Sequence, residues 1–429
     1  MAQFSQRIWR GGVQDGLPRR DRKSCSYDVY IPDRLADRMI ALDGPVAADV
    51  ADAEAAITRL NMQVRALSDS EALARLLLRS EAVASSKIEG LEIGARRLLK
   101  AEAARGLGEK PADVTATDVL GNIDAMVYAL GSLAEGEPIT ADLLFEVHRR
   151  LLAGSPLAQQ GGRMRTEQNW IGGSSFNPCS AAFVPPPWEL VEEYMADLVR
   201  FCNDDSLPAV AQAAVAHAQF ETVHPFIDGN GRTGRALVHL VLRRRGLALR
   251  VLPPVSLVLA TWADEYVAAL NATRYIGSAD SPKAHQGLNR WIGVFAAACR
   301  RAVADATLFE ERVSALQAEW RSRLGRVRAN SALDLLIRAL PGAPILTIRG
   351  AADVIGRSVP AANGAVARMV EAGILSQSTV GRRNRAFEAG ELIQAFTDLE
   401  RQLASPTGDT RSTPPTRPVP RRGRHVVEG

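Results

Sequence analysis

The chain has 429 residues, of which 46% are hydrophobic and 23% charged, and its formal net charge is +4 at pH 7. These values are ordinary for a globular protein of one to three domains and do not favour a nucleic-acid binder. No apolar run approaches the roughly 20 residues that a membrane span needs, and the N-terminus lacks the apolar core of a signal peptide. We therefore expect a cytoplasmic protein without a membrane partner.

The four cysteines are scattered along the chain, and no two of them form a C-x-x-C pair. They are Cys25, Cys179, Cys202 and Cys299. This pattern fits reduced thiols in a cytoplasmic protein better than a disulfide framework or a zinc site.

The N-terminal segment, residues 1–45, is rich in Arg, Asp, Gly and Pro and is expected to form an extended arm. Tyr30, Pro32 and Leu35 are the residues that could anchor this arm on a core. A mainly helical region follows, because its apolar residues recur at helical spacing.

Within that helical region, residues 68–90 read SDSEALARLLLRSEAVASSKIEG and predict one helix. Ser68 with Glu71 has the form of a capping box, and Gly90 fits the C-terminal stop. Glu89 then lies in the last turn, where the helix dipole disfavours a carboxylate. An acidic residue at such a place is usually just solvated.

Residues 169–187, NWIGGSSFNPCSAAFVPPP, interrupt the helical pattern. Gly, Ser, Asn and Pro between short apolar runs predict a hairpin or an ordered loop. A helix is expected to resume at Trp188, and residues 206–223 should form another, Ala-rich helix with a proline in its first turn.

The segment HPFIDGNGRTGR, residues 224–235, concentrates the polar chemistry of the chain. Pro225 biases His224 away from helical angles, so the preceding helix should end there. The segment then enters a second helix, whose first N–H groups have no internal partners. Gly229 and Gly231 let these N–H groups approach an anion, which predicts a phosphate-binding cradle.

The side chains around this predicted cradle suit a nucleotide. Arg232 and Arg235 share one helix face, and guanidinium groups match phosphate oxygens. Asp228 can hold a magnesium ion that bridges phosphates, and Asn230 can donate its amide to a phosphate oxygen. His224 has a pKa suited to accepting a proton. Together they predict group transfer from a nucleotide.

Simpler interpretations exist for each part of the motif. A DGNG turn is by itself a common loop, and a histidine before proline is usually structural. His224 and Asp228 could ligate zinc, but no further Cys or His ligand lies nearby, and the chain has no Walker-type phosphate loop. His217 is interpreted as a core histidine that supports the site.

The C-terminal part changes in composition near Gly325. Residues 325–403 predict a helix, a helix-turn-helix and a hairpin that turns at Gly381, which describes a small winged-helix domain. Residues 404–429 are dominated by Pro, Arg, Thr and Gly and are expected to be disordered.

The twelve-residue motif resembles the signature H-x-F-x-[DE]-G-N-G-R-x-x-R of the Fic domain, and every fixed position is filled. YIPDRL, ITADLLFEVHRRLL, GRMRTEQNWIGGSS, FVPPP and RWIGVFAAAC are also similar to stretches of bacterial Fic proteins. The resemblance covers roughly residues 30–300. It implies a mainly α fold: a helical Fic bundle with a β-hairpin flap, followed by a small α+β winged-helix domain. The expected divisions are an arm (1–45), a helical region with an inhibitory helix (46–110), a catalytic domain (111–310), the winged helix (325–403) and the tail (404–429).

The resemblance also implies residue roles. His224 would deprotonate a Ser, Thr or Tyr hydroxyl of a protein, which then attacks the α-phosphate of ATP. Phe226 would anchor the loop, and Asp228 would hold Mg²⁺. The implied nucleotide contacts come from the motif, the flap and one later tyrosine: Gly229, Asn230, Gly231, Arg232, Thr233, Gly234, Arg235, Asn169, Trp170, Ile171, Gly172 and Tyr266.

SSKIEG, residues 85–90, resembles the inhibitory motif [ST]-x-x-x-E-[GN] of this family. The motif residues are Ser85, Glu89 and Gly90. In that resemblance Glu89 pairs with Arg235 and takes the place of the γ-phosphate.

The leading hypothesis is an autoinhibited protein adenylyltransferase that modifies a protein hydroxyl, including its own. Its alternatives are removal of AMP from a modified protein, transfer from another nucleotide, and a DNA-binding regulator. For the last, the winged helix offers five arginines to phosphates: Arg357, Arg368, Arg382, Arg383 and Arg385. The sequence leaves the target protein and a homodimer open.

Overall fold

The computed structural model describes the chain except for residues 12–18, 37, 67–69, 112, 381–383 and 404–429. Ser68, Gly381, Arg382, Arg383 and the C-terminal tail therefore lie outside the described residues. The described part is mainly helical, as expected. None of its helices is both long enough and apolar enough to cross a membrane.

The larger, N-terminal body contains eleven α-helices among its described residues. They are α1 (Gly44–Ala66), α2 (Ser70–Ile88), α3 (Ala95–Gly106), α4 (Val114–Gly131), α5 (Ala141–Leu152), α6 (Val191–Cys202), α7 (Ala209–Val223), α8 (Asn230–Arg244), α9 (Val255–Thr261), α10 (Ala263–Ala272) and α11 (Pro282–Leu324). Single 3-10 turns lie at Arg19–Arg22, Ala158–Gln160, Pro178–Ser180 and Trp188–Leu190.

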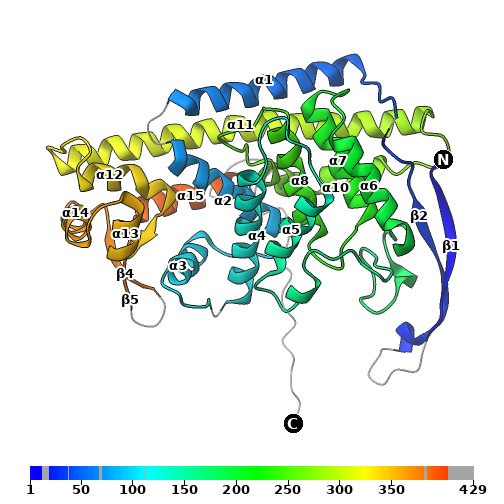
Figure 1. The fold of residues 1–429 in the computed structure, drawn as a ribbon, viewed down its shortest axis with the longest axis horizontal. Helices are drawn as coiled ribbons and strands as arrows, with labels where there is room; N and C mark the ends of the chain where they lie inside the picture. Colours follow the sequence, from blue (N-terminus) through cyan, green and yellow to red (C-terminus); the bar gives the residue numbers. More distant parts are fainter. Residues whose placement is uncertain (12–18, 37, 67–69, 112, 381–383, 404–429) are drawn as a thin grey trace, which may run out of the picture.

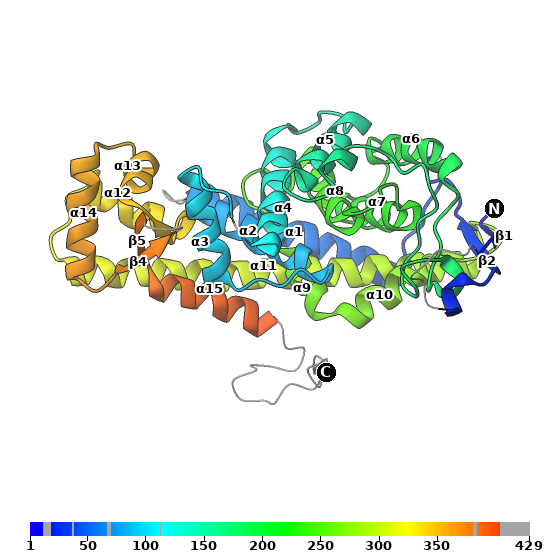
Figure 2. The same cartoon turned by 90° about the horizontal axis from the view of Figure 1, so that it is seen from below.

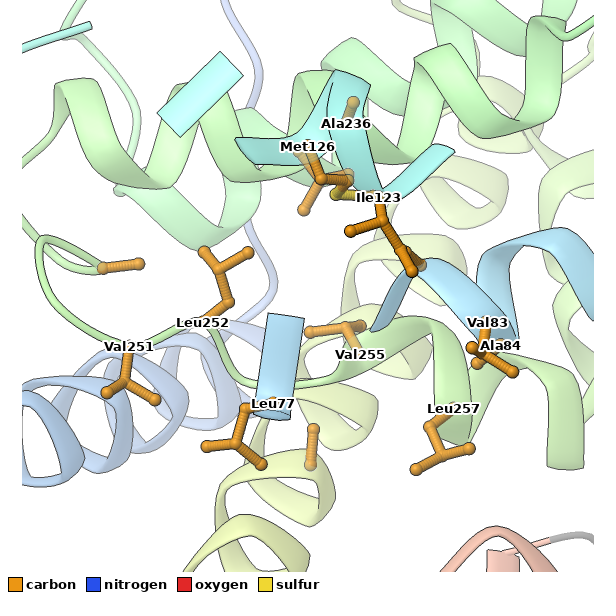
Figure 3. Close-up of a cluster of buried hydrophobic side chains, with 14 of the residues drawn as sticks. Leu77, Val83, Ala84, Ile123, Met126, Ala236, Val251, Leu252, Val255 and Leu257 are labelled. Atoms are coloured by element: carbon orange, nitrogen blue, oxygen red, sulfur yellow. The ribbon is translucent and has the colours of Figure 1, made fainter. Parts of the chain in front are cut away.

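The helix pair α7 and α8 forms the centre of this body (Figure 1). Every residue of α7 is buried, because its many alanines let neighbouring helices approach closely. The helix begins at Ala209, three residues later than predicted, with Pro208 as its N-cap. The helix α2 packs against α4, α8 and α9. Figure 3 shows the apolar contact among them, to which α2 contributes Leu77, Val83 and Ala84.

The longest element, α11, has 43 residues and runs along nearly the whole molecule, with α1 packed beside it (Figures 1 and 2). It passes without a break through residue 310, where the catalytic domain was expected to end. Trp291, Phe295 and Trp320 are fully buried along its length. The helix therefore joins the central pair to the C-terminal elements.

The N-terminal arm is a β-hairpin rather than a simple extended segment. Its strands, β1 (Gln3–Trp9) and β2 (Cys25–Ile31), are antiparallel. Tyr30 is buried and donates its hydroxyl to the carbonyl oxygen of Tyr275 at 2.8 Å, so the expected anchor is confirmed.

A disulfide joins Cys25 of this hairpin to Cys179. The expectation of four reduced thiols was therefore wrong for this pair, while Cys202 and Cys299 are free and buried. The error has a simple cause: the two cysteines are 154 residues apart, and spacing along the chain does not show which loops meet. The cysteine pattern consequently gives no support to a cytoplasmic location.

The C-terminal unit follows α11 as helix, strand, two helices and a hairpin. Its elements are α12 (Ala332–Ala339), a 3-10 turn at Leu340–Gly342, β3 (Ile345–Leu346), α13 (Ile348–Ile355), α14 (Val359–Glu371), β4 (Ser376–Val380), β5 (Asn384–Glu388) and α15 (Gly390–Leu403). The three strands pair in the order β3-β5-β4. Leu99 and Ala104 of α3 join Ile345, Ala386 and Ile393 in one apolar cluster, so this unit packs directly on the N-terminal body.

Candidate active site

The motif loop begins where α7 ends. His224 is the C-cap of α7 and adopts a left-handed conformation with φ 50°, as expected for a residue that leaves the helix before Pro225. Such a conformation is uncommon for a residue with a Cβ atom. It turns the chain out of the helix axis, and the His224 backbone N–H still donates to the Phe220 carbonyl oxygen at 2.8 Å.

The loop is braced from inside by Phe226 and Asn230. Phe226 is fully buried, as predicted. The Asn230 amide donates to the Phe226 carbonyl oxygen at 2.8 Å, and its oxygen accepts from the Phe226 backbone N–H at 2.8 Å. Asn230 was expected to donate to a phosphate, but in this structure its side chain closes the loop instead.

His148 of α5 holds the same loop from the other side, and sequence reasoning missed it. Its ring stacks on Phe226 with centroids 3.7 Å apart. Its Nδ1 accepts from the Gly162 backbone N–H at 2.9 Å, so Nε2 carries the proton and donates to the Asp228 carbonyl oxygen at 2.9 Å. Burial lowers the pKa of His148 to about 4, which keeps this neutral tautomer.

The helix α8 starts at the predicted anion cradle. Gly229 is its N-cap with φ 74°, a left-handed conformation that glycine adopts at no steric cost. A Cβ atom at Gly231 would collide with the carboxylate of Glu89. The side chain of an acidic residue therefore already lies against the helix start, where dipole and free N–H groups favour a negative charge.

Arg235 holds that carboxylate. Its Nη2 donates to Glu89 Oε1 at 2.8 Å and to the Ser85 carbonyl oxygen at 2.8 Å, and its Nε donates to Ser85 Oγ at 2.9 Å. Arg235 is buried, whereas the Glu89 side chain keeps 33% of its surface exposed. Burial alone would raise the pKa of Glu89, but Arg235, with smaller contributions from Arg232 and His224, holds it below the ordinary value.

The end of α2 explains why Glu89 can reach the cradle. The last helical residue is Ile88, so Glu89 follows the helix instead of lying in its last turn. Gly90 has φ 81°, as expected for a residue that reverses the chain after a helix. The carboxylate thus leaves the axis of α2 and reaches the start of α8.

Two carboxylates border the other end of the cradle. Asp228 is half exposed and accepts from Arg232 Nη2 at 3.1 Å. Burial raises the pKa of Asp118 on α4, and the negative charge of Asp228 adds a smaller increase. The Oδ1 atom of Asp118 is buried without a hydrogen-bond partner. The described residues contain no cluster of three or more His, Cys, Asp or Glu that could hold a metal. Asp228 and Asp118 are the carboxylates at this place that could hold an ion such as Mg²⁺, which prefers oxygen ligands.

His224 faces a buried carboxylate that sequence reasoning also missed. Glu221 Oε2 lies 3.9 Å from His224 Nδ1, one helical turn earlier on α7. Burial lowers the pKa of His224 to about 4, so the imidazole is neutral and able to accept a proton at pH 7. Burial raises the pKa of Glu221 to about 7. The three-residue spacing was the available signal for this pair.

Arg165 fastens the flap to the end of α7 and was likewise missed. Its Nε donates to the His224 carbonyl oxygen at 2.9 Å, and its Nη2 donates to the Pro186 carbonyl oxygen at 2.6 Å. A single buried guanidinium thus links the segment after the flap to a carbonyl group that the end of α7 leaves unpaired.

The predicted flap residues lie beside the motif. Asn169 Nδ2 donates to the carbonyl oxygens of His224 and Phe226 at 3.2 and 3.0 Å. Ile171 pairs with Phe183 through an isolated bridge rather than through strands. Trp170 packs edge-on against Trp9 of the N-terminal hairpin, with centroids 6.0 Å apart. Gly172 follows with φ 74°.

Three other predicted contact residues lie on the inner side of the motif. Thr233 donates its hydroxyl to the Gly229 carbonyl oxygen within α8, and Gly234 faces Phe220 and Glu221. Tyr266 is buried, and its hydroxyl lies 2.7 Å from His217 Nε2. The structure therefore brings His224, Arg232, Arg235 and Asn169 together at the cradle and places Thr233, Gly234 and Tyr266 behind it.

The fold and the site together define a helical-bundle protein whose central helix pair presents an anion-binding loop beside a neutral histidine. Residues 138–242 match the model of the Fic/DOC family, and residues 47–131 match that of the Fic/DOC family N-terminal region. The chain therefore contains matches to the Fic/DOC domain and to the N-terminal region of the same family.

Several known proteins resemble parts of this chain. It is 37% identical over 154 residues to the protein adenylyltransferase fic-1 of Caenorhabditis briggsae, an alignment that covers 35% of this chain and 27% of the relative. It is 38% identical over 135 residues to the protein of the same name from Caenorhabditis elegans, covering 31% and 24%. The chain thus spans about a quarter of the length of these curated relatives.

A solved structure extends the likeness over most of the fold. A Fic family protein from Desulfovibrio desulfuricans G20 superposes with a TM-score of 0.51 at 21% identity, and the match covers 81% of this chain and 97% of the other. At this identity the likeness concerns the fold, which includes the Fic helical bundle.

Proposed function

We propose that this protein transfers AMP from ATP to a Ser, Thr or Tyr hydroxyl of a protein, and that Glu89 inhibits the transfer. The names of the C. briggsae and C. elegans relatives support the reaction class. The observation that carries the proposal is the position of Glu89: an anion held by Arg235 lies against the glycine-opened start of α8, next to His224. A site that accommodates this carboxylate has the charge and the N–H donors that a phosphate needs.

The proposed reaction assigns one task to each group. His224 takes the proton of the target hydroxyl, the hydroxyl oxygen forms a bond to the α-phosphorus of ATP, and the bond to the β-phosphate oxygen breaks, releasing pyrophosphate. Gly229 and Gly231 expose the N–H groups that receive phosphate oxygens. Arg232 and Arg235 bind the outer phosphates. Mg²⁺ held at Asp228 would neutralise phosphate charge.

The remaining parts of the site are proposed to prepare it. His148 and Asn230 fix the loop, and Glu221 fixes the orientation of the His224 ring. The flap, from Asn169 to Gly172, is proposed to cover the nucleotide and to align the target segment by strand pairing.

The proposed inhibition follows from competition for Arg235. While Glu89 and Ser85 occupy this guanidinium, one of the two phosphate clamps is withheld, and the triphosphate cannot take its productive position. Removal of the Glu89 carboxylate should release Arg235 without disturbing the fold, because the Glu89 side chain is partly exposed and lies beyond the end of α2.

The test is labelling with ATP that carries the tag on its α-phosphate, followed by mass spectrometry of the labelled hydroxyl. Glu89→Gly should raise autolabelling roughly 5–150-fold, the factor that corresponds to a coupling of about 1–3 kcal/mol. In that background, His224→Ala should reduce labelling by about 10²–10⁴-fold, and Arg235→Ala should abolish the gain.

A matched control is available on the same segment. Glu92 is exposed and lies three residues beyond Glu89, so Glu92→Gly repeats the chemical change without touching Arg235 and should leave labelling at the wild-type level. Equal labelling by wild type and Glu89→Gly would show that the contact is not inhibitory. Incubating AMP-labelled protein with both forms distinguishes transfer from removal of AMP, and GTP, CTP and UTP donors distinguish ATP from other nucleotides.

We also propose that the C-terminal unit is a winged helix, which its element order and the strand order β3-β5-β4 support. Among its arginines, Arg368 donates to the Leu324 carbonyl oxygen and Arg357 to that of Asn330. These side chains are engaged within the protein, so no observation favours DNA binding over protein contacts.

A further inference from the structure

A cavity lies between the body of the protein and its C-terminal unit, and no residue of the motif loop lines it. Its volume is about 410 Å³. Helices α2, α3 and α4 line one side, and the segment from Gly342 to Val354, which contains β3 and α13, lines the other. Figures 1 and 2 show α3 beside the C-terminal unit in both views. A cavity of this size accommodates a small organic molecule.

Most of the cavity wall is apolar. Leu78 of α2, Leu99 of α3 and Ile123 of α4 face Ile345 and Leu346 of the C-terminal unit. A ligand for this wall needs a hydrocarbon body, because burying apolar surface is the main source of affinity in such pockets.

One buried charge lines this wall. Arg79 of α2 is 4% exposed. Its Nη2 donates to Glu102 Oε1 at 3.1 Å and to the Gly342 carbonyl oxygen at 3.2 Å. Its Nε and Nη1 are buried with no hydrogen-bond partner. Buried donors of a charged group are rarely left unpaired, because such a donor has lost its hydrogen bonds to water without gaining a partner.

The other charges around the cavity favour an anion of low charge. Arg75 and Arg349 also line it, and the acidic residues of the lining are Glu102 and Asp353. Arg75 pairs with Glu71 and Arg79 with Glu102, so these charges are nearly balanced and leave no surplus for a dianion such as phosphate. The two unpartnered donors of Arg79 instead match the two acceptor oxygens of one carboxylate.

The cavity touches α2, the helix that ends one residue before Glu89. Arg79 and Glu89 are ten residues apart, and α2 continues unbroken from Arg79 to Ile88, so they are separated by about 15 Å along the helix direction. The cavity described here coexists with the contact between Glu89 and Arg235. A ligand that binds this arrangement therefore stabilises it over any arrangement in which α2 has moved.

We propose that this cavity binds a small monoanion with a hydrocarbon body, of the class of aliphatic carboxylates, and that the bound anion holds α2 in its inhibitory position. The binding site stands on the cavity and on Arg79. Its effect on activity rests on the proposed inhibition by Glu89.

Calorimetry with the full chain tests the binding site, with octanoate as the probe and octan-1-ol as the neutral analogue. Octanoate should bind saturably, and octan-1-ol at least about tenfold more weakly, since the hydrogen bonds that Arg79 donates to a carboxylate are stronger than one to a neutral hydroxyl. Arg79→Gln should lose octanoate binding by a similar factor.

A second variant tests the site independently, in case Arg79→Gln does not fold. Val354 is 42% exposed and lines the cavity, so Val354→Trp should fill it from the solvent side and abolish binding. Val370 is similarly exposed on α14 and does not line the cavity, so Val370→Trp is the matched control and should bind octanoate like wild type. The absence of saturable binding, or equal binding by Val354→Trp and Val370→Trp, would overturn the site.

Labelling with ATP tests the effect on activity separately. Octanoate should lower autolabelling of wild type and leave that of Glu89→Gly unchanged. Equal inhibition of both forms would refute the link through α2, and the binding measurement would stand unaffected. A failure of AMP transfer in every form would reject the proposed reaction without bearing on the calorimetry.

Discussion

The buried histidines around the motif predict how stability depends on pH. Burial lowers the pKa of His148 and His224 to about 4 and that of His217 to about 3. The unfolded chain binds protons at these groups near pH 6.5, so folding loses stability as the pH falls from 6.5 towards 4. Glu221, with a pKa raised to about 7 by burial, acts in the opposite direction. Its contribution is fully present below about pH 4.5 and is lost as the pH rises through about 7.

Between pH 5 and 6 the three histidines contribute more to the change of stability with pH than the one glutamate does. The free energy of unfolding should therefore rise with pH by up to about 2–3 kcal/mol per unit in this range. Denaturant unfolding at a series of pH values measures this slope. His217→Gln should reduce this slope by about 1.4 kcal/mol per pH unit, the value that corresponds to one titrating group. Tyr266→Phe removes the hydroxyl partner of His217 but keeps the imidazole, so an equal reduction in this control would contradict the assignment.

His148 provides a second prediction for a single residue. Replacement by Phe keeps an aromatic ring on Phe226 but removes both hydrogen bonds that tie α5 and Gly162 to the motif loop. In the Glu89→Gly background, kcat for the proposed AMP transfer should fall about 10²-fold, because small displacements of reacting groups have effects of this size. ATP affinity should change less. Phe145 also contacts Phe226 but makes no such bonds, so Phe145→Leu should retain most of the activity, and similar losses in both variants would indicate a packing effect alone.

Among the elements, the disulfide makes a prediction about the flap. Cys25 lies on β2 and Cys179 in the 3-10 turn that follows the predicted flap residues, so the bond ties the N-terminal hairpin to this region. Cys25→Ser should lower the free energy of unfolding by about 2–4 kcal/mol. It should also make residues 171–183 more sensitive to limited proteolysis.

Reductant provides the control for this prediction. Treating the wild type with a thiol should reproduce the proteolysis pattern of Cys25→Ser, and the same treatment should leave the variant unchanged. A wild-type protein whose flap resists proteolysis equally with and without the bond would contradict this prediction and show that other contacts, such as those of Trp9 with Trp170 and of Asn177 with Asp21, are sufficient.

The elements that the sequence predicted well are those governed by local chemistry. The end of α7 at His224 follows from Pro225, and the start of α8 follows from glycines without side chains. The pairing of Glu89 with Arg235 was expected only from the resemblance. His148, Arg165 and the disulfide were not predicted, because each joins segments that lie far apart in the chain, and no local pattern indicates which of them meet.

Across the whole molecule, the shared core predicts a single unfolding transition. Trp320 of α11 is fully buried and donates its Nε1–H to Glu391 of α15 at 2.6 Å, and one continuous apolar cluster reaches from the body into the C-terminal unit. Calorimetry of the full chain should show one transition. Trp320→Ala should keep this single transition but lower the free energy of unfolding by about 3–5 kcal/mol.

The exposed residue Leu308 on the same helix supplies the control, and Leu308→Ala should leave the transition in place. Two separate transitions would contradict this prediction. If Trp320→Ala shifted only one of them, the C-terminal unit would unfold independently of the body.

The uninterrupted course of α11 also ties the two halves together by helical phase. Each residue of an α-helix advances the chain by about 1.5 Å and turns it by about 100°. Deleting one residue between Val313 and Trp320 would therefore rotate everything beyond it by more than a quarter of a turn, and α13 would no longer face α3. Deleting a whole turn would nearly restore the angle but draw the C-terminal unit about 5 Å inward. The length of this helix thus sets the dimensions of the cavity that α2, α3 and α13 enclose.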